Sequence, residues 1–234
     1  MEQIKFALGE YEIFACIVGG SPLVLVIFLI CNPSSNIQTL FSIINSNLSI
    51  PLALLIVFLS YILGGAVQGI TWKYFLFLCK FFRLDYSYLR ATISERDALL
   101  PQPSDIQTLK ALEFEDKIVV LLRERIGIPK DVDWLNHRLT AYLKERSSLA
   151  VITAESFMAN HIMYRNMSFG CLLLSLVILF NMLRTWLFTF DQLVLILSFL
   201  LISYLTFFRS LSFRRLNIRE LLLGFYFSAC NRVV

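Results

Sequence analysis

Residues 13–31 read IFACIVGGSPLVLVIFLIC, and residues 50–70 read IPLALLIVFLSYILGGAVQGI. Both runs lie in a segment of sixty residues, Ile13–Trp72, that contains no Asp, Glu, Lys, Arg or His. A soluble domain needs charged faces toward water, whereas each run is close to the roughly 20 apolar residues with which a helix crosses about 30 Å of hydrocarbon. The segment therefore predicts two helices that span a membrane.

A second pair of apolar runs, at residues 167–183 and 192–208, lies near the C-terminal end. Hydrophobic residues make up 57% of the chain, above the roughly 45–50% of soluble domains. No alternating pattern of a β-strand stands out between the two pairs. We therefore predict an all-α integral membrane protein in which four transmembrane helices, two plus two, flank a cytosolic helical domain.

The predicted spans divide the chain into four parts. They are a transmembrane hairpin at residues 1–72, a cytosolic helical domain at residues 73–166, a second hairpin at residues 167–208 and a basic cytosolic helix at residues 209–234. No Gly or Pro occurs from Val132 to Phe169, so one helix is expected to run from the cytosol into the third span, with its weakest point at Ser147–Ser148. The fourth span is expected to continue through Ser210–Ala229.

Basic residues predict the orientation of the spans. Of the 21 Lys and Arg residues, only Arg184 falls on the far side, and the loop 32–49 has none. The protein is therefore predicted to span an inner membrane, with both termini and the central segment on the cytosolic side. The apolar stretch IQTLFSII in the loop also allows this loop to re-enter the bilayer. Pro22 is expected to kink the first span, which is tolerated where a neighbour satisfies the freed carbonyl.

The cytosolic segment carries two patterns typical of amphipathic helices. From Asp105 to Ile126 apolar residues recur mostly at steps of three and four. A second helix begins at Asp131 or Asp133, and its apolar stripe is formed by Trp134, Leu135, Leu139, Tyr142 and Leu143. Each stripe is either a core or a docking face for a soluble protein partner. The candidate residues of such a face are Leu109, Leu122 and Trp134.

Catalytic groups are lacking in the predicted spans, which contain no Asp, Glu, Lys or His and no phosphate-binding or nucleophile motif. His137 and His161 are 24 residues apart, which is about 36 Å on a straight helix, so both are expected to be ordinary surface residues. The five cysteines have no metal-ligand spacing. We expect a non-enzymatic protein without cofactor or metal. A lipid-handling enzyme would lack a recognisable nucleophile.

Small residues and polar residues mark the second span. The sequence GGAVQG places Gly64, Gly65 and Gly69 where helices can approach closely, within one protomer or between protomers. Polar side chains in the predicted spans are expected to form hydrogen bonds between helices or, alternatively, to line a water-filled path. The candidate pore-lining residues are Gln68, Ser60 and Asn181.

Four arginines follow the fourth span: Arg209, Arg214, Arg215 and Arg219. They are expected to anchor the chain on anionic lipid headgroups. Two alternatives are a phosphate-binding surface, for a lipid head or for a nucleotide or RNA partner, and pairing with Glu155 inside the protein.

These features favour a membrane module that forms a homo-oligomer and acts as a pore-forming or membrane-perturbing effector under the control of its cytosolic domain. In overall layout the chain is similar to small helical membrane effectors of bacterial antiviral defence. That analogy concerns arrangement and rests on no shared motif. The alternative function is an anchor or scaffold that recruits a soluble protein to the inner membrane.

Overall fold

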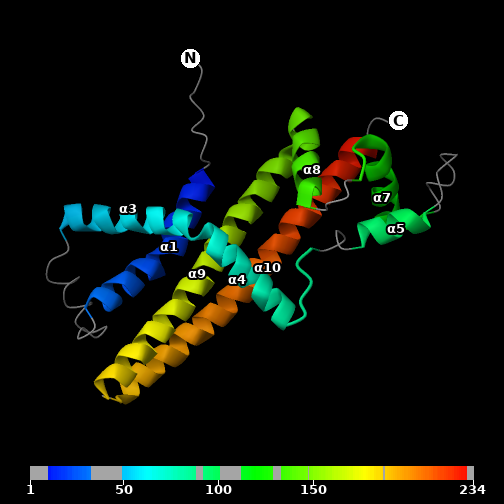
Figure 1. Cartoon of the computed structure of the whole chain (residues 1–234). Helices are drawn as coiled ribbons and strands as arrows, with labels where there is room; N and C mark the ends of the chain where they lie inside the picture. The colour runs from blue at the N-terminus through cyan, green and yellow to red at the C-terminus, as the bar shows by residue number, and fades with distance from the viewer. Residues whose placement is uncertain are drawn as a thin grey trace. The chain divides into compact units, whose positions relative to one another are not determined.

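The computed structural model describes residues 10–32, 49–87, 92–100, 112–128, 133–146, 148–186 and 188–230. Within these ranges the chain forms helices and no strand, as predicted (Figure 1). The helices are α1 (Glu10–Cys31), α3 (Ile50–Ala66), α4 (Gln68–Phe81), α5 (Ile93–Leu99), α7 (Phe114–Arg125), α8 (Asp133–Glu145), α9 (Leu149–Thr185) and α10 (Phe190–Cys230).

Two of the described helices, α9 and α10, are long and apolar enough to cross a membrane. They contain the predicted third and fourth spans. The predicted second span is divided into α3 and α4, which are bent by 57° at the break between them and would count as a third crossing if they form one span. The apolar part of α1, Ala15–Cys31, is shorter. Length and composition thus support two crossings, or three with the bent pair.

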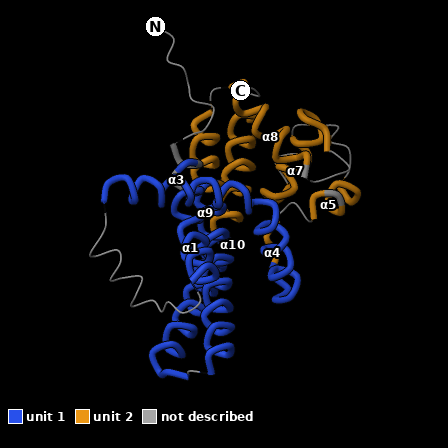
Figure 2. The backbone as a smooth tube through the Cα atoms, turned by 60° about the vertical axis from the view of Figure 1, so that its left-hand side comes forward, with its two compact units in different colours: residues 1–84, 159–212 blue, residues 85–158, 213–234 orange. Residues whose placement is uncertain are grey.

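The chain divides into two compact units, which Figure 2 shows in blue and orange. Unit 1 comprises residues 1–84 and 159–212, and unit 2 comprises residues 85–158 and 213–234. Both α9 and α10 contribute residues to both units. The predicted continuation of the fourth span is confirmed, because α10 is one helix of 41 residues.

In unit 1, α1 and α3 pack closely through small residues. A Cβ atom added to Gly20 would overlap the carbonyl oxygen of Ser60, and one added to Gly64 would overlap the carbonyl oxygen of Cys16. Only glycine therefore fits at these two positions, since any side chain would separate the helices. The small-residue packing that the sequence predicts for Gly64 thus lies between two helices of one protomer.

Pro22 lies inside α1, and the helix continues through it. Proline has no N–H group, so the carbonyl four residues earlier loses its usual donor. The hydroxyl of Ser21 donates to this carbonyl, Val18 O, at 2.9 Å. A neighbouring side chain thus replaces the N–H donor that the proline lacks, which is the condition for a proline inside a spanning helix.

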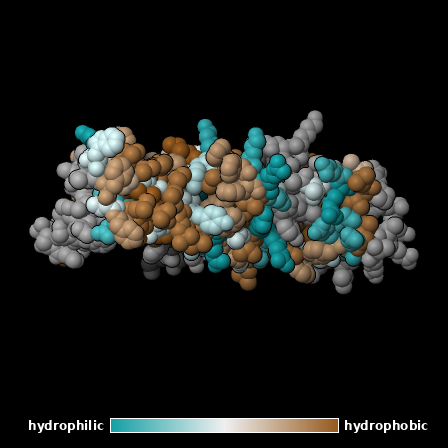
Figure 3. Space-filling view, turned by 90° about the horizontal axis from the view of Figure 1, so that it is seen from below, coloured by the Kyte–Doolittle hydropathy of each residue, from teal (hydrophilic) through white to brown (hydrophobic). Residues whose placement is uncertain are grey.

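Large apolar side chains remain exposed on the helices of unit 1. On α3, Leu54, Phe58 and Ile62 follow one another at four-residue steps and are all exposed. Leu197, Leu201 and Leu205 repeat this pattern on α10. Figure 3 shows apolar side chains gathered into broad brown areas of one face of the molecule. Apolar surface of this extent is typical of contact with lipid or with another protein.

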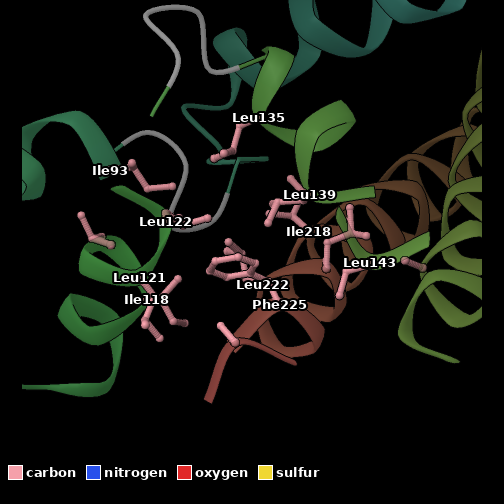
Figure 4. Packing of buried hydrophobic residues seen from close by; sticks show 14 of the residues in the cluster. Ile93, Ile118, Leu121, Leu122, Leu135, Leu139, Leu143, Ile218, Leu222 and Phe225 are labelled. Atoms are coloured by element: carbon pink, nitrogen blue, oxygen red, sulfur yellow. The ribbon is translucent and has the colours of Figure 1, made fainter. Parts of the chain in front are cut away.

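The core of unit 2 is formed by α7, α8, Ile93 of α5 and the adjoining parts of α9 and α10 (Figure 4). The helix predicted from Asp105 begins at Phe114, and residues 105–111 lie outside the described part of the chain. Five successive residues of α7, Ile118–Leu122, are buried. The helix is therefore covered on several sides, whereas the sequence suggested one apolar stripe.

The helix predicted from Asp133 is α8, and its stripe is largely confirmed. Leu135, Leu139 and Leu143 are buried at four-residue steps, but Trp134 is 62% exposed. The long helix expected toward the third span is interrupted at its predicted weak point. There α8 ends at Glu145 and α9 begins at Leu149, with the Ser148 hydroxyl accepting a hydrogen bond from the Ala150 amide at 3.3 Å.

Candidate functional site

Polar side chains of α4, α9 and α10 lie together inside unit 1. We call this group the polar cluster, and its members are Gln68, Thr71, His161, Arg165, Asn166, Ser168, Ser203 and Ser210. All except Gln68, which is half-buried, are buried. Polar groups removed from water need hydrogen-bond partners, and among apolar helices the partner usually belongs to a neighbouring helix.

Arg165 on α9 is the charged member of the cluster and is only 6% exposed. Its Nε donates to Thr71 Oγ1 at 3.2 Å, and its Nη2 donates to the Gln68 carbonyl at 3.4 Å. The guanidinium carbon lies 5.6 Å from the centre of the Trp72 ring, within the range of a cation–π interaction. Three contacts with the first turns of α4 therefore hold the buried charge.

Asn166 connects α9 to the same part of the chain. Its Oδ1 accepts a hydrogen bond from the Thr71 hydroxyl at 2.7 Å, and its Nδ2 donates to the Gly64 carbonyl at 3.0 Å. Gly64 lies in the last turn of α3, where carbonyls lack donors from their own helix. Asn166 thus donates to a carbonyl in the last turn of α3 and accepts from a side chain in the first turn of α4, so its amide bonds on both sides of the bend.

Ser168 and Ser203 form a reciprocal pair between α9 and α10. Each hydroxyl donates to the backbone carbonyl of the other residue at 2.8 Å. The Tyr74 hydroxyl of α4 lies 3.1 Å from Ser168 Oγ. Small side chains that bond across helices allow close approach in an apolar surrounding, so this pair fixes the register of α9 against α10 in unit 1.

His161 is buried, with 1% of its surface exposed, which corrects the expectation of a surface residue. Its Nδ1 lies 2.8 Å from Ser210 Oγ and 3.1 Å from the Ser210 carbonyl oxygen. The rings of Phe75 and Trp72 cover it at centroid distances of 4.9 and 6.1 Å. The other histidine, His137, is exposed as predicted.

A serine beside a histidine is also the arrangement of a nucleophile and its base. Here Ser210 Oγ is also 3.1 Å from the His161 carbonyl oxygen, to which it can donate, and neither residue is exposed to a substrate. The pair therefore serves to join α9 to α10 in this structure.

Three cluster residues share one face of α9, which is a signal that the sequence does contain. His161, Arg165 and Ser168 stand at i, i+4 and i+7, so their side chains project from the same side of the helix. The sequence does not identify them as a cluster, because Arg165 and His161 precede the predicted third span and lie in the segment that is predicted to be cytosolic.

The three glycines of the second span have different surroundings. Gly64 packs against α1, whereas a Cβ added to Gly65 or Gly69 would meet no described atom within 4 Å beyond the neighbouring backbone of its own helix. The break between α3 and α4 falls between Gly65 and Gly69, with a bend of 57°. The two residues therefore do not form the flat face of one continuous helix that their spacing predicts.

Each candidate pore-lining residue has a hydrogen-bond partner inside the chain. The Ser60 hydroxyl donates to the Ile56 carbonyl at 2.8 Å, and Gln68 Nε2 lies 3.6 Å from Cys16 Sγ. Asn181 Nδ2 donates to the Leu29 carbonyl at 3.4 Å. In this arrangement Gln68 and Asn181 bond to neighbouring helices, the first of the two roles predicted for them.

The four arginines after the fourth span are not equivalent. Arg209, Arg215 and Arg219 are exposed, whereas Arg214 is buried and its Nη1 lies 3.5 Å from Met158 Sδ. Arg215 donates from Nε to the Asp85 carbonyl at 2.6 Å. The exposed arginines remain candidates for headgroup or phosphate contacts, but the buried side chain of Arg214 cannot reach a phosphate outside the protein.

The predicted docking residues differ in their exposure to solvent. Leu122 is fully buried in the core of unit 2, and Trp134 is exposed. Leu109 lies outside the described residues. Of this set, Trp134 is the described residue whose side chain a partner could reach.

Comparisons with protein families, with curated proteins and with solved structures gave no match for this chain. Its function is therefore inferred from its own residues.

Proposed function

We propose that this chain is a non-enzymatic, multi-pass membrane protein that forms a homo-oligomer and opens a path through the bilayer, and that the polar cluster keeps this path closed. The observation that carries the proposal is Arg165. Its guanidinium is buried in the unit that also holds the apolar parts of α9 and α10. Ionised side chains within spanning segments are rare, and they typically mark transport paths or moving elements.

In the proposed topology α1, α3 with α4, α9 and α10 provide four crossings of an inner membrane. The distribution of Lys and Arg supports this, because only Arg184 of 21 basic residues lies in a segment assigned to the far side. The termini and the central segment are then cytosolic. The exposed Arg209, Arg215 and Arg219 would contact anionic headgroups on that side.

The hydrogen bonds of the polar cluster are suited to a set of helices that can pack in two ways, one closed and one open. They join α4 to α9 and α9 to α10 through side chains. Single hydrogen bonds between membrane helices contribute about 0.6 kcal/mol on average and at most about 1.7 kcal/mol. Several together favour one closed packing, and a modest stimulus can still exchange them for another.

Dye release from sealed vesicles tests this function. Protein in vesicles of phosphatidylethanolamine and phosphatidylglycerol is expected to release a small trapped dye. Arg165→Gln should speed release by about tenfold, the equivalent of ~1.4 kcal/mol in the open–closed equilibrium, because the contacts with Thr71 and Gln68 are lost.

Arg184→Gln is the matched control, since Arg184 is exposed, and its release rate should equal that of the natural protein. Circular dichroism and size-exclusion chromatography confirm that both variants remain folded. If the natural protein and Arg165→Gln leave the vesicles as tight as protein-free vesicles, the pore proposal is wrong.

The mass of the protein in nanodiscs tests the oligomer. Native mass spectrometry is expected to show a closed assembly of about four or more copies. Gly65→Leu should reduce this mass if the open surface at Gly65 contacts a second copy, since a Cβ added to Gly65 meets no atom of another helix within 4 Å in the described part of the chain. A monomer in every lipid would contradict the proposal.

The second candidate function, an anchor for a soluble protein, is favoured by Trp134. An exposed tryptophan is unusual on a solvated helix and is a frequent anchor of protein interfaces. This function predicts a stable complex in pull-down experiments that Trp134→Ala weakens by about tenfold or more. Trp134→Phe should keep most of the affinity. No partner and clear dye release would exclude the anchor in favour of the pore.

A further inference from the structure

Unit 2 contains a cavity of about 350 Å³, within the roughly 300–1,000 Å³ of small-molecule sites. Side chains of α8, α9 and α10 surround it. Its apolar wall includes Ala141, Val151, Met158 and Leu221, and its polar lining includes Asn136 and Asn217. Mostly apolar walls with a few directed polar groups are typical of ligand sites.

Two amide oxygens at this cavity lack a donor. Asn217 is 4% exposed, and its Nδ2 donates to the Ala154 carbonyl at 2.7 Å. That bond fixes the orientation of the amide, because its nitrogen must face the carbonyl. Within the described residues, Asn217 Oδ1 and Asn136 Oδ1 are both buried without a hydrogen-bond partner. Buried acceptors of this kind are usually satisfied, so each one requires an explanation.

The charges at the cavity are balanced. Lys144 Nζ and Glu155 Oε1 of the cavity lining form an ion pair at 2.8 Å, and both side chains are exposed. The Lys and Glu residues of the lining itself therefore carry no excess of either sign. A ligand has to bring hydrogen-bond donors for the two asparagine oxygens and an apolar body for the remaining wall.

We propose that this cavity binds a small molecule with an apolar body and a terminal NH2 group, either a carboxamide or a primary ammonium. Both groups present at least two N–H donors, as many as there are unpaired asparagine oxygens at the cavity. The apolar body lies against Val151, Met158 and Leu221. Binding at this cavity does not depend on whether the chain forms a pore.

Three probes of nearly equal size test the proposal on the full chain in lipid nanodiscs. Phenylacetamide carries a neutral NH2 group, phenethylamine carries an ammonium, and methyl phenylacetate has acceptors only. Ligand-observed NMR titrations with empty nanodiscs in parallel remove the signal from partition into lipid. Saturable binding with a dissociation constant of about 1 mM is expected for at least one NH2 probe, as for fragments of this size.

The ester should bind about tenfold more weakly or not at all, because it leaves both asparagine oxygens without donors. Binding of phenylacetamide alone would assign a neutral amide ligand, and binding of phenethylamine alone would assign a cationic one. Equal binding of the ester would overturn the proposal. Absence of saturable binding by all three probes would also overturn it and would leave water as the occupant.

Two variants locate the binding. Asn217→Leu removes the acceptor at similar volume and should weaken the NH2 probe by about tenfold or more. Ala141→Trp fills the cavity from an exposed position of α8, so it tests the site even if the first variant folds poorly. Thr153→Trp, at an exposed position of α9 that does not line the cavity, should bind as the natural protein does. Unchanged affinity in Ala141→Trp would place the binding elsewhere and contradict the assignment.

Discussion

Gly64→Ala is expected to destabilise the protein strongly, whereas Gly65→Ala, one residue further along, is expected to be harmless. A methyl group at Gly64 would overlap the backbone of Cys16, and a backbone cannot move aside as a flexible side chain can. Overpacking usually costs about 1–3 kcal/mol and occasionally more. Because the obstacle here is a carbonyl group, we expect about 3 kcal/mol or more, or a fall in Tm of about 6–12 °C.

The pair of variants separates packing from helix propensity. Alanine is favoured over glycine inside a helix by up to about 1 kcal/mol, so this contribution is the same for both variants. At Gly65 no other helix of the described residues lies within 4 Å of the added atom, and Tm should be unchanged or slightly raised. Thermal unfolding in detergent, followed by circular dichroism, measures the difference. Equal values of Tm for the two variants would show that α1 does not pack on α3 as described.

Leu122→Asp is expected to unfold unit 2, and Trp134→Asp is expected to leave it folded. Leu122 is 0% exposed and belongs to the core with Leu135, Leu139 and Phe225 (Figure 4). Loss of a buried leucine costs about 2–5 kcal/mol, and burial of an unpaired carboxylate adds several more. The sum is comparable to the whole stability of a typical domain, about 5–15 kcal/mol.

Hydrogen exchange measured by mass spectrometry distinguishes the outcomes. In Leu122→Asp the amides of α7 and α8 should exchange as fast as those of an unfolded chain. In Trp134→Asp, where the altered side chain faces solvent, they should keep their protection. This control also tests the anchor function, because a folded Trp134→Asp variant that fails to retain a partner identifies a docking residue. Slow exchange in Leu122→Asp would contradict the described core.

The helices that could be predicted from the sequence are those whose burial follows the helical period. On α8, Leu135, Leu139 and Leu143 recur every four residues among mostly polar neighbours, and the structure buries these three. On α7 five successive residues are buried, so a single apolar stripe does not describe the burial of this helix, which begins at Phe114. The long apolar runs of α9 and α10 were recognisable by length, whereas the break at Val67 depends on tertiary contacts around it.

The polar cluster could not be predicted because its partners are distant in the sequence. Arg165 meets Thr71 across 94 residues, and Ser168 meets Ser203 across 35. The sequence alone predicts a surface position for His161, and Arg165 belongs to the same segment, which is rich in charged residues. The regular spacing on α9 marks a polar face, but only the packing of α4 and α10 on that face removes it from water.

The bend at Val67 restricts how α3 and α4 can lie in a bilayer. With 57° between the two axes, at least one of them leans by about 28° or more from the membrane normal, while spanning helices lean by about 20° on average. α4 contains Lys73 and Lys80 and α3 has no charged residue, so we expect α4 to be the helix that leans.

If α3 stands upright, the 14 residues of α4 advance only about 11 Å in depth. A change in bilayer thickness or lateral tension would then change the tilt of α4 relative to the membrane normal. Thr71 and Gln68, which hold Arg165, lie within one turn of the bend about which this tilt changes. Tension in the surrounding lipid would therefore act directly on the hydrogen bonds of the buried charge.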